Sequence, residues 1–144
     1  MSQAGSPRID RNDESGEHAA RRLESERIGW LTTVAADGTP QVSPIWFLWD
    51  GEDFLVYSRD SPRIKNLGGE SRVSLNLDGN GRGGDIVIVE GTASIDTATP
   101  SAAENSEYLA KYKPVVDDYG WTPEWFAGRY SIPIRIAPTK YRYW

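Results

Sequence analysis

Residues 28–57, IGWLTTVAADGTPQVSPIWFLWDGEDFLVY, contain three runs of β-branched and aromatic side chains separated by two Asp-Gly pairs. Such runs favour strands, and Asp-Gly is a frequent tight turn between antiparallel strands. The turns at Asp37-Gly38 and Asp50-Gly51 therefore predict an antiparallel meander whose strands are 28–34, 41–49 and 54–57. Because Pro44 lacks a backbone donor, the middle strand is expected at a sheet edge or with a bulge.

The rest of the chain adds further strands and a few helices. Strands are predicted over 72–77, 86–95 and 132–144, and helices over 14–27, 61–67, 99–113 and from Thr122-Pro123 onward. The fold class is therefore mainly β with flanking helices. About six antiparallel strands favour a small closed barrel, because closure removes exposed sheet edges. Residues 1–12 are polar and are expected to form a disordered arm, which leaves 13–144 as a single domain.

Composition excludes several classes of protein. The net charge of −5 argues against a nucleic-acid binder, and no apolar run approaches the roughly 20 residues that span a bilayer. The N-terminus lacks the apolar core of a signal peptide, so a cytoplasmic location is expected. The absence of cysteine removes thiolate, zinc-ribbon and iron–sulfur chemistry, and the single His18 is expected to be a solvated side chain rather than a metal ligand. An enzyme of this composition would rely on a bound cofactor for its reactivity.

The segment 57–67, YSRDSPRIKNL, places three cations where a strand is followed by a helix start. Cations oppose the positive end of a helix dipole, whereas a bound anion is favoured there by the free backbone N–H groups. Arg59, Arg63 and Lys65 therefore indicate a phosphate or carboxylate site, to which Ser58 and Ser61 add hydroxyl donors. The alternative is a solvated surface turn in which Asp60 pairs with Arg63.

The segment 42–49 alternates between two faces, with Ser43, Ile45, Phe47 and Trp49 on one and Val42, Pro44, Trp46 and Leu48 on the other. Pro44 leaves neighbouring backbone groups free for another partner, so this strand is suited to line a flat heteroaromatic ring. The alternative is that these aromatic side chains simply fill the core.

Several of these segments together resemble the pyridoxamine 5'-phosphate oxidase-like, FMN-binding split-barrel superfamily. The resemblance covers about residues 23–142, and its markers are RIGWLTTV (27–34), PIWFLWD (44–50), YSR (57–59) with KN (65–66), and RVSLNL (72–77). The run DGNGRGGDIVIVEG (78–91) more narrowly resembles an actinobacterial subgroup of deazaflavin-dependent enzymes, which use coenzyme F420.

The resemblance implies a six-stranded split barrel that forms a homodimer with cofactor sites at the subunit interface. Ser43, Pro44, Ile45 and Trp46 would run beside the cofactor ring. Ser58 and Arg59 would meet the ribityl–phosphate region, Lys65 and Asn66 would hold the phosphate, and Arg63 belongs to the same cationic set. Tyr143 and Trp144 would approach the partner's site.

The activity implied is hydride transfer between F420 and a small, flat, electron-poor substrate, with FMN as the alternative cofactor. A non-catalytic carrier of F420 or flavin is the alternative outside enzymes. No residue is singled out as catalytic, although Tyr57 or a backbone N–H is a candidate to stabilise an anionic product. The chain lacks an evident basic set for a second, substrate phosphate near its C-terminus, which argues against vitamin B6 oxidation.

Overall fold

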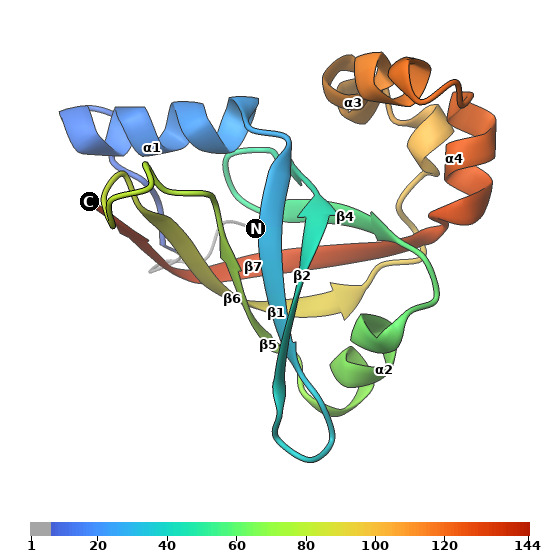
Figure 1. The fold of residues 1–144 in the computed structure, drawn as a ribbon, viewed down its shortest axis with the longest axis horizontal. Helices are drawn as coiled ribbons and strands as arrows, with labels where there is room; N and C mark the ends of the chain where they lie inside the picture. The colour runs from blue at the N-terminus through green and yellow to red at the C-terminus, as the bar shows by residue number, and fades with distance from the viewer. Residues whose placement is uncertain (1–6) are drawn as a thin grey trace.

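The computed structural model of the protein describes residues 7–144. Four α-helices, one 3-10 helix and seven strands follow one another in this part of the chain (Figure 1). The helices are α1 (Glu14–Ser25), α2 (Pro62–Gly69), η1 (Ala102–Glu104), α3 (Ser106–Asp118) and α4 (Pro123–Arg129). The strands are β1 (Ile28–Val34), β2 (Pro40–Trp46), β3 (Leu48–Trp49), β4 (Phe54–Ser58), β5 (Arg72–Asn76), β6 (Val87–Ile95) and β7 (Ile132–Tyr143).

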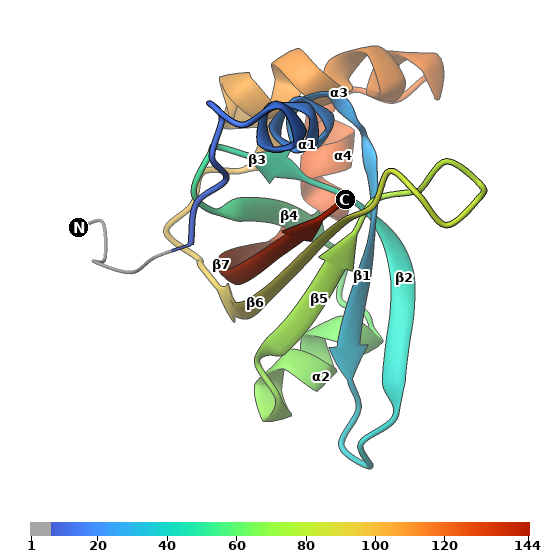
Figure 2. The same cartoon turned by 90° about the vertical axis from the view of Figure 1, so that its left-hand side faces the viewer.

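The seven strands form one antiparallel sheet in the order β2-β1-β5-β6-β7-β4-β3. The two edge strands, β2 and β3, are neighbours in the sequence and are separated only by Phe47. The chain thus passes from one edge of the sheet to the other at a single residue, which requires the sheet to curl back on itself. Figure 2 shows this curl, which agrees with the mainly β, split-barrel architecture expected from the sequence.

The meander predicted for residues 28–57 is correct at its two turns, but its middle strand is not continuous. The first turn joins β1 to β2, with Ile28 opposite Trp46, and the second joins β3 to β4, with Trp49 opposite Phe54. The predicted strand 41–49 is divided at Phe47, and its two parts pair with different neighbours. This division explains why the sheet has seven strands instead of the expected six.

The hydrophobic core has two parts, one on each face of β4. Phe54 and Val56 point into the curl of the sheet, where α1 closes the cluster with Leu23. Leu55 and Tyr57 point to the other face, where they pack against α3 and α4. All five residues of β4 are buried for this reason. Each large side chain buried in this way contributes about 1.5–3 kcal/mol to the hydrophobic stabilisation of the fold.

Side-chain caps set where three of the helices begin. Thr122 caps α4 by accepting a hydrogen bond from the amide of Trp125 at 3.1 Å, as the Thr-Pro pair predicts. The helix predicted over 99–113 is instead the short η1 followed by α3, because Asn105 caps α3 at the amide of Tyr108. No helix within residues 7–144 is both long enough and apolar enough to cross a bilayer.

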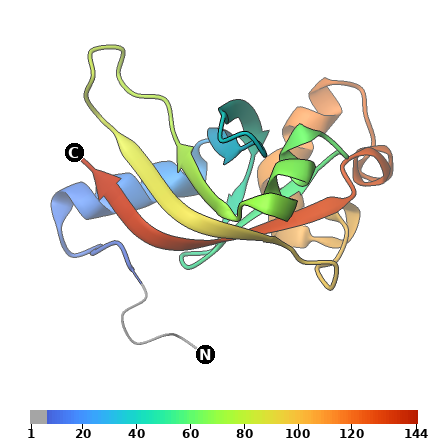
Figure 3. The ribbon, with the colours of Figure 1, turned by 90° about the horizontal axis from the view of Figure 1, so that it is seen from below.

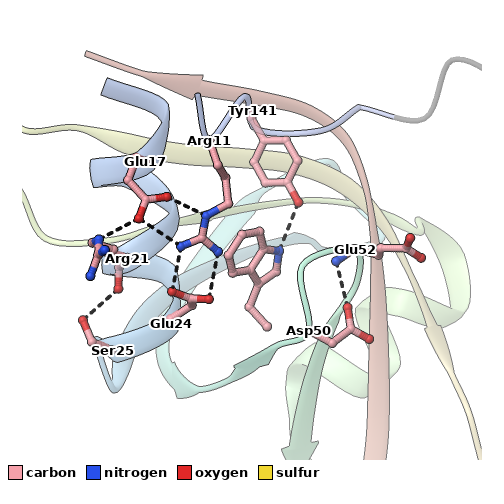
Figure 4. A network of polar contacts seen from close by, with 9 residues as sticks. Arg11, Glu17, Arg21, Glu24, Ser25, Asp50, Glu52 and Tyr141 are labelled. Carbon is pink, nitrogen blue, oxygen red and sulfur yellow. Dashed lines mark hydrogen bonds and ion pairs between the residues drawn. The ribbon is translucent and has the colours of Figure 1, made fainter. Parts of the chain in front are cut away.

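Residues 7–12 lie against the domain, although the sequence predicted an arm that extends to residue 12. Arg11 forms ion pairs with Glu17 at 2.7 Å and Glu24 at 3.0 Å (Figure 4), and Ile9 packs against the core. A Cβ atom added to Gly16 would lie 2.0 Å from the carbonyl oxygen of Asp10, so the segment approaches α1 closely. Polar composition did not reveal these contacts. The remainder of the predicted arm, residues 1–6, lies outside the described residues.

Strands β6 and β7 run side by side along the length of the molecule (Figure 3). The glycine-rich loop before β6 is held at both ends by α1 and β1. The indole of Trp30 donates to the carboxylate of Asp78 at 2.9 Å, and His18 contacts Asp85 at 2.9 Å. The His18 side chain is 61% exposed, in keeping with the solvated position expected for it.

Candidate functional site

The face of β2 that carries Trp46 is covered by aromatic rings from α3 and α4. Trp46 stacks on Tyr112, with ring centroids 4.8 Å apart, and on Phe126 at 5.1 Å. The neighbouring Ile45 points the other way, into the curl of the sheet. The period-two alternation predicted for this segment is therefore confirmed, and both of its faces contact the protein interior.

A cavity of about 190 Å³ lies beside this strand, between β2, β4, α2 and α4. Its walls are mainly aromatic, and Arg63 is the only charged residue among them. The lining residues are Pro44, Ile45, Trp46, Tyr57, Arg63, Tyr119, Trp121, Phe126 and Tyr130. Aromatic walls with few polar groups are typical of sites that bind small planar molecules.

Arg63 projects from the first turn of α2 and has no acidic partner among residues 7–144. Its terminal nitrogens donate to the hydroxyl of Ser43 at 2.6 Å and to that of Ser58 at 3.1 Å. Its buried Nε atom has no hydrogen-bond partner, and no carboxylate of residues 7–144 forms an ion pair with it. Burial lowers the pKa of Arg63 from its ordinary value, and Tyr130 opposes that shift. A buried cation is normally paired, so this guanidinium favours an anion beside it.

The buried hydroxyl of Ser61 also lacks a partner. Ser61 occupies the N-cap position of α2, but its side chain makes no capping hydrogen bond. Helix N-termini have backbone N–H groups without an intrahelical acceptor, and these groups favour anions. Two unsatisfied donors, Ser61 Oγ and Arg63 Nε, therefore accompany the start of this helix. The alternative to an anion site was a solvated surface turn in which Asp60 pairs with Arg63. The structure does not show this pair, because Arg63 contacts Ser43 and Ser58 instead.

Two other predicted residues on α2 lie away from the aromatic cavity. Lys65 is exposed, and together with Asn66 it lines a separate groove of about 1050 Å³ between α2 and the β1–β2 turn. The amide nitrogen of Asn66 donates to Thr33 Oγ1 and Gln41 Oε1, both at 2.9 Å. Asn66 therefore braces α2 against the hairpin, and its amide hydrogens are already used.

The predicted cofactor set thus divides into two groups. The first group meets at the aromatic cavity, either as its walls or through the hydrogen bonds of Arg63. Its members are Ser43, Pro44, Ile45, Trp46, Ser58 and Arg63. Lys65 and Asn66 belong to the groove, and Arg59 is exposed and lines neither space. Tyr143 ends β7 and Trp144 follows it, at the opposite end of that strand from α4 (Figure 1).

Tyr57 lines the cavity, but its hydroxyl group is already engaged. It donates to the carbonyl oxygen of Pro100 at 2.7 Å and accepts from the amide of Asn105 at 3.1 Å. Burial raises the pKa of Tyr57, while the bond from Asn105 opposes that rise. The hydroxyl hydrogen therefore points away from any molecule in the cavity, and Tyr57 is a wall rather than a proton donor.

The sequence did not reveal the aromatic residues that come from the α3–α4 region. Trp121, Phe126 and Tyr130 were visible as apolar residues around a helix start, but that pattern does not indicate which part of the sheet the helix covers. Among residues 7–144 there is no cluster of three or more histidine or acidic side chains arranged to hold a metal ion.

The sequence pattern of a family described as pyridoxamine 5'-phosphate oxidase matches residues 15–144. No curated protein sequence matches the chain closely enough to count as a relative.

Solved structures share the fold over most of their length. An F420 reductase is 25% identical, with a TM-score of 0.61 over 85% of this chain and 94% of its own. The conserved hypothetical protein Rv2991 from Mycobacterium tuberculosis is 23% identical, with a TM-score of 0.67 over 100% of this chain and 89% of its own. A FAD-binding protein from Mesorhizobium loti is 21% identical, with a TM-score of 0.58 over 88% and 90%.

Proposed function

The chain belongs to the pyridoxamine 5'-phosphate oxidase family, and on that premise we propose that it is an oxidoreductase that binds F420 at the cavity beside β2. The observation that carries this proposal is the half-buried Arg63 guanidinium, whose buried Nε has no partner among residues 7–144, as the buried hydroxyl of Ser61 has none. The phosphate of a flavin-type cofactor supplies the negative charge that this arrangement lacks. The similarity to an F420 reductase favours F420 over FMN.

The residues of the cavity suit the two ends of such a cofactor. Arg63 would hold the phosphate together with Ser61, and charge-assisted hydrogen bonds of this kind are about twice as strong as neutral ones. Trp46, Trp121 and Phe126 line the cavity, where they would give a planar ring apolar walls and keep water from it. When bound, F420 supplies the hydride chemistry at its ring. The protein then contributes binding, orientation and the exclusion of water, and Tyr57 is not placed as a proton donor.

We also propose that the protein acts as a homodimer in which Tyr143 and Trp144 approach the partner's site. Two exposed apolar side chains support this arrangement: Val42 on the edge strand β2 is 60% exposed, and Trp144 is 64% exposed. Apolar side chains of this size that stand in solvent are typical of surfaces that become buried on association. Light scattering at micromolar concentration should report twice the monomer mass, and a stable monomer would contradict the interface site.

Fluorescence titration with F420 and FMN, side by side, tests the cofactor. Arg63→Met should weaken binding of the preferred cofactor by roughly tenfold to a hundredfold, because it removes an interaction of about 1.5–3 kcal/mol. Arg82→Met is the matched control, because Arg82 is an exposed arginine in the loop before β6. Equal affinities in the two variants would contradict the phosphate assignment.

Turnover separates an enzyme from a carrier. The protein loaded with reduced F420 should reduce members of a panel of quinones, enones and nitro compounds. Tight binding without turnover against the whole panel would favour the carrier, and preferential binding of FMN would favour a flavin-dependent enzyme of the same fold.

A further inference from the structure

Lys111 lies on α3 and lines a cleft that is separate from the aromatic cavity. The cleft has a volume of about 610 Å³, and Ser25, Arg27, Glu24 and Glu107 also contribute to its walls. The Lys111 ammonium donates to the carbonyl oxygen of Phe47 at 2.8 Å and lies 3.9 Å from the centre of the Phe47 ring. Within residues 7–144 it forms no ion pair with a carboxylate. The proposed cofactor site does not use this cation.

The surroundings of Lys111 favour its neutral amine. Burial lowers the pKa of Lys111 to about 8 from the ordinary 10.5, Arg27 lowers it further, and Glu26 opposes the shift. Glu24 and Glu107 face the same cleft and are the other charged groups near the amine. At pH 7, an amine of pKa 8 is about one tenth neutral, whereas an amine of pKa 10.5 is about 0.03% neutral. Desolvation is one of the ordinary ways in which a lysine becomes a nucleophile.

We propose that Lys111 is a modification site whose amine accepts an acyl group from a small acyl phosphate, with Arg27 holding the phosphate group. The cleft is open to solvent, and it offers Arg27 as a cation for the phosphate oxygens. This inference concerns the cleft alone and does not rest on the proposed cofactor.

The acyl transfer is balanced without any further reactant. The lone pair of the neutral amine attacks the acyl carbon, and a carbon–nitrogen bond forms. The carbon–oxygen bond to the phosphate breaks, its electron pair leaves with the phosphate, and the nitrogen loses a proton to solvent. The products are an amide at Lys111 and inorganic phosphate. The amide keeps one N–H, which can still donate to the Phe47 carbonyl, so the fold should survive the modification.

The chain offers internal controls, because it has only four lysines: Lys65, Lys111, Lys113 and Lys140. The intact protein is incubated at pH 7 with acetyl phosphate and, separately, with a neutral acetyl ester, and each site is quantified by peptide mass spectrometry. Lys111 should be acetylated at least about tenfold faster than Lys113, which lies on the same helix but is exposed and paired with Asp117 at 2.8 Å. Equal rates at these two lysines would overturn the assignment of Lys111.

Arg27→Gln tests the phosphate contact. The substitution should lower the acetylation rate at Lys111 more with acetyl phosphate than with the neutral ester. The ratio of the two rates should fall by about fivefold or more. An unchanged ratio would overturn the role of Arg27. Melting curves of the Arg27→Gln variant and of the acetylated protein should show that both remain folded.

Discussion

The phenol oxygen of Tyr112 accepts a hydrogen bond from the backbone amide of Phe47 at 2.8 Å, across 65 residues of sequence. Its hydroxyl hydrogen is within reach of the carbonyl oxygens of Arg27 at 2.5 Å and of Phe47 at 2.9 Å. Phe47 lies between β2 and β3, where no strand pairs with it. The backbone groups that the sheet leaves open are therefore satisfied by a side chain of α3. The same ring stacks on Trp46, so this contact also fixes one wall of the aromatic cavity.

Tyr112→Phe is expected to destabilise the protein while keeping the ring in place. The substitution leaves the buried amide of Phe47 without an acceptor, and an unsatisfied buried group costs about 1–3 kcal/mol. For a chain of this size, thermal unfolding should shift downward by roughly 3–10 °C. Tyr119→Phe is the control, because Tyr119 is 62% exposed. A melting temperature that falls equally in both variants would contradict the role of the Tyr112 hydroxyl.

The division of the strand at Phe47 could not be predicted from the sequence. Residues 42–49 keep one alternating pattern throughout, so nothing local distinguishes Phe47 from its neighbours. What ends the strand is a contact with α3 far along the chain, and such contacts are invisible to periodicity. The Asp-Gly turns on either side are local signals, and both were located correctly.

The cationic segment 57–67 was recognised from the sequence, but its local pattern did not rank the three cations, and only the family resemblance assigned the phosphate to Lys65. The local sequence makes Arg59, Arg63 and Lys65 equally plausible as anion ligands, because only the docking of α2 decides which of them turns inward. In the structure Arg63 is half-buried beside two serines, whereas Arg59 and Lys65 are exposed. The aromatic wall from Trp121 to Tyr130 was missed for the same reason, since it depends on how α4 packs.

Gly16→Ala should release the N-terminal segment from α1. The new methyl group would lie 2.0 Å from the backbone oxygen of Asp10, which a rigid backbone cannot accommodate. We expect a lower melting temperature and faster proteolysis near residues 9–12, where Ile9 and Arg11 now make their contacts.

Gly68→Ala is the matched helical control for this substitution. Nothing lies within 4 Å of a Cβ atom added at Gly68. Alanine favours a helix over glycine by about 1 kcal/mol, so this variant should be as stable as the parent or more so. Equal behaviour of the two alanine variants would show that the 9–12 segment is not anchored at Gly16.

The depressed pKa of Lys111 makes the stability of the fold depend on pH. The pKa of Lys111 is about 8 in the folded state and near 10.5 in an ordinary solvated lysine. Between these values the unfolded chain binds more protons than the folded one, so the contribution of Lys111 to stability rises as pH increases from about 8 to about 10.5. The free energy of unfolding of wild type and of Lys111→Met is measured in denaturant at pH 7, 8.5 and 10. As the pH rises, wild type should become more stable relative to the variant. A constant difference across this range would contradict the shift.

Lys65 and Arg63 should differ in how salt affects their contributions to cofactor binding. Lys65 is exposed at an open groove, whereas Arg63 is partly buried at the aromatic cavity. Between about 0.1 M and about 1 M salt the screening length falls from about 10 Å to about 3 Å, and solvent-exposed charges lose most of their interaction. The family resemblance puts the cofactor phosphate at Lys65, and on that assignment Lys65→Ala should weaken F420 binding by about tenfold at low salt and have little effect at high salt. Arg63→Met should bind F420 more weakly than wild type at both salt concentrations.

The control for the two-salt titration is Lys113→Ala, because the exposed Lys113 pairs only with Asp117 on its own helix. This variant should match wild type throughout. Arg8 is not a suitable control, since it forms an ion pair with Glu52 at 3.0 Å. If Lys65→Ala matches Lys113→Ala at low salt, Lys65 does not contact the cofactor, and the phosphate is held at Arg63 and Ser61 as proposed. If instead Arg63→Met recovers wild-type affinity at high salt, the guanidinium is reached by solvent, and the buried, water-excluding site proposed for the phosphate is wrong.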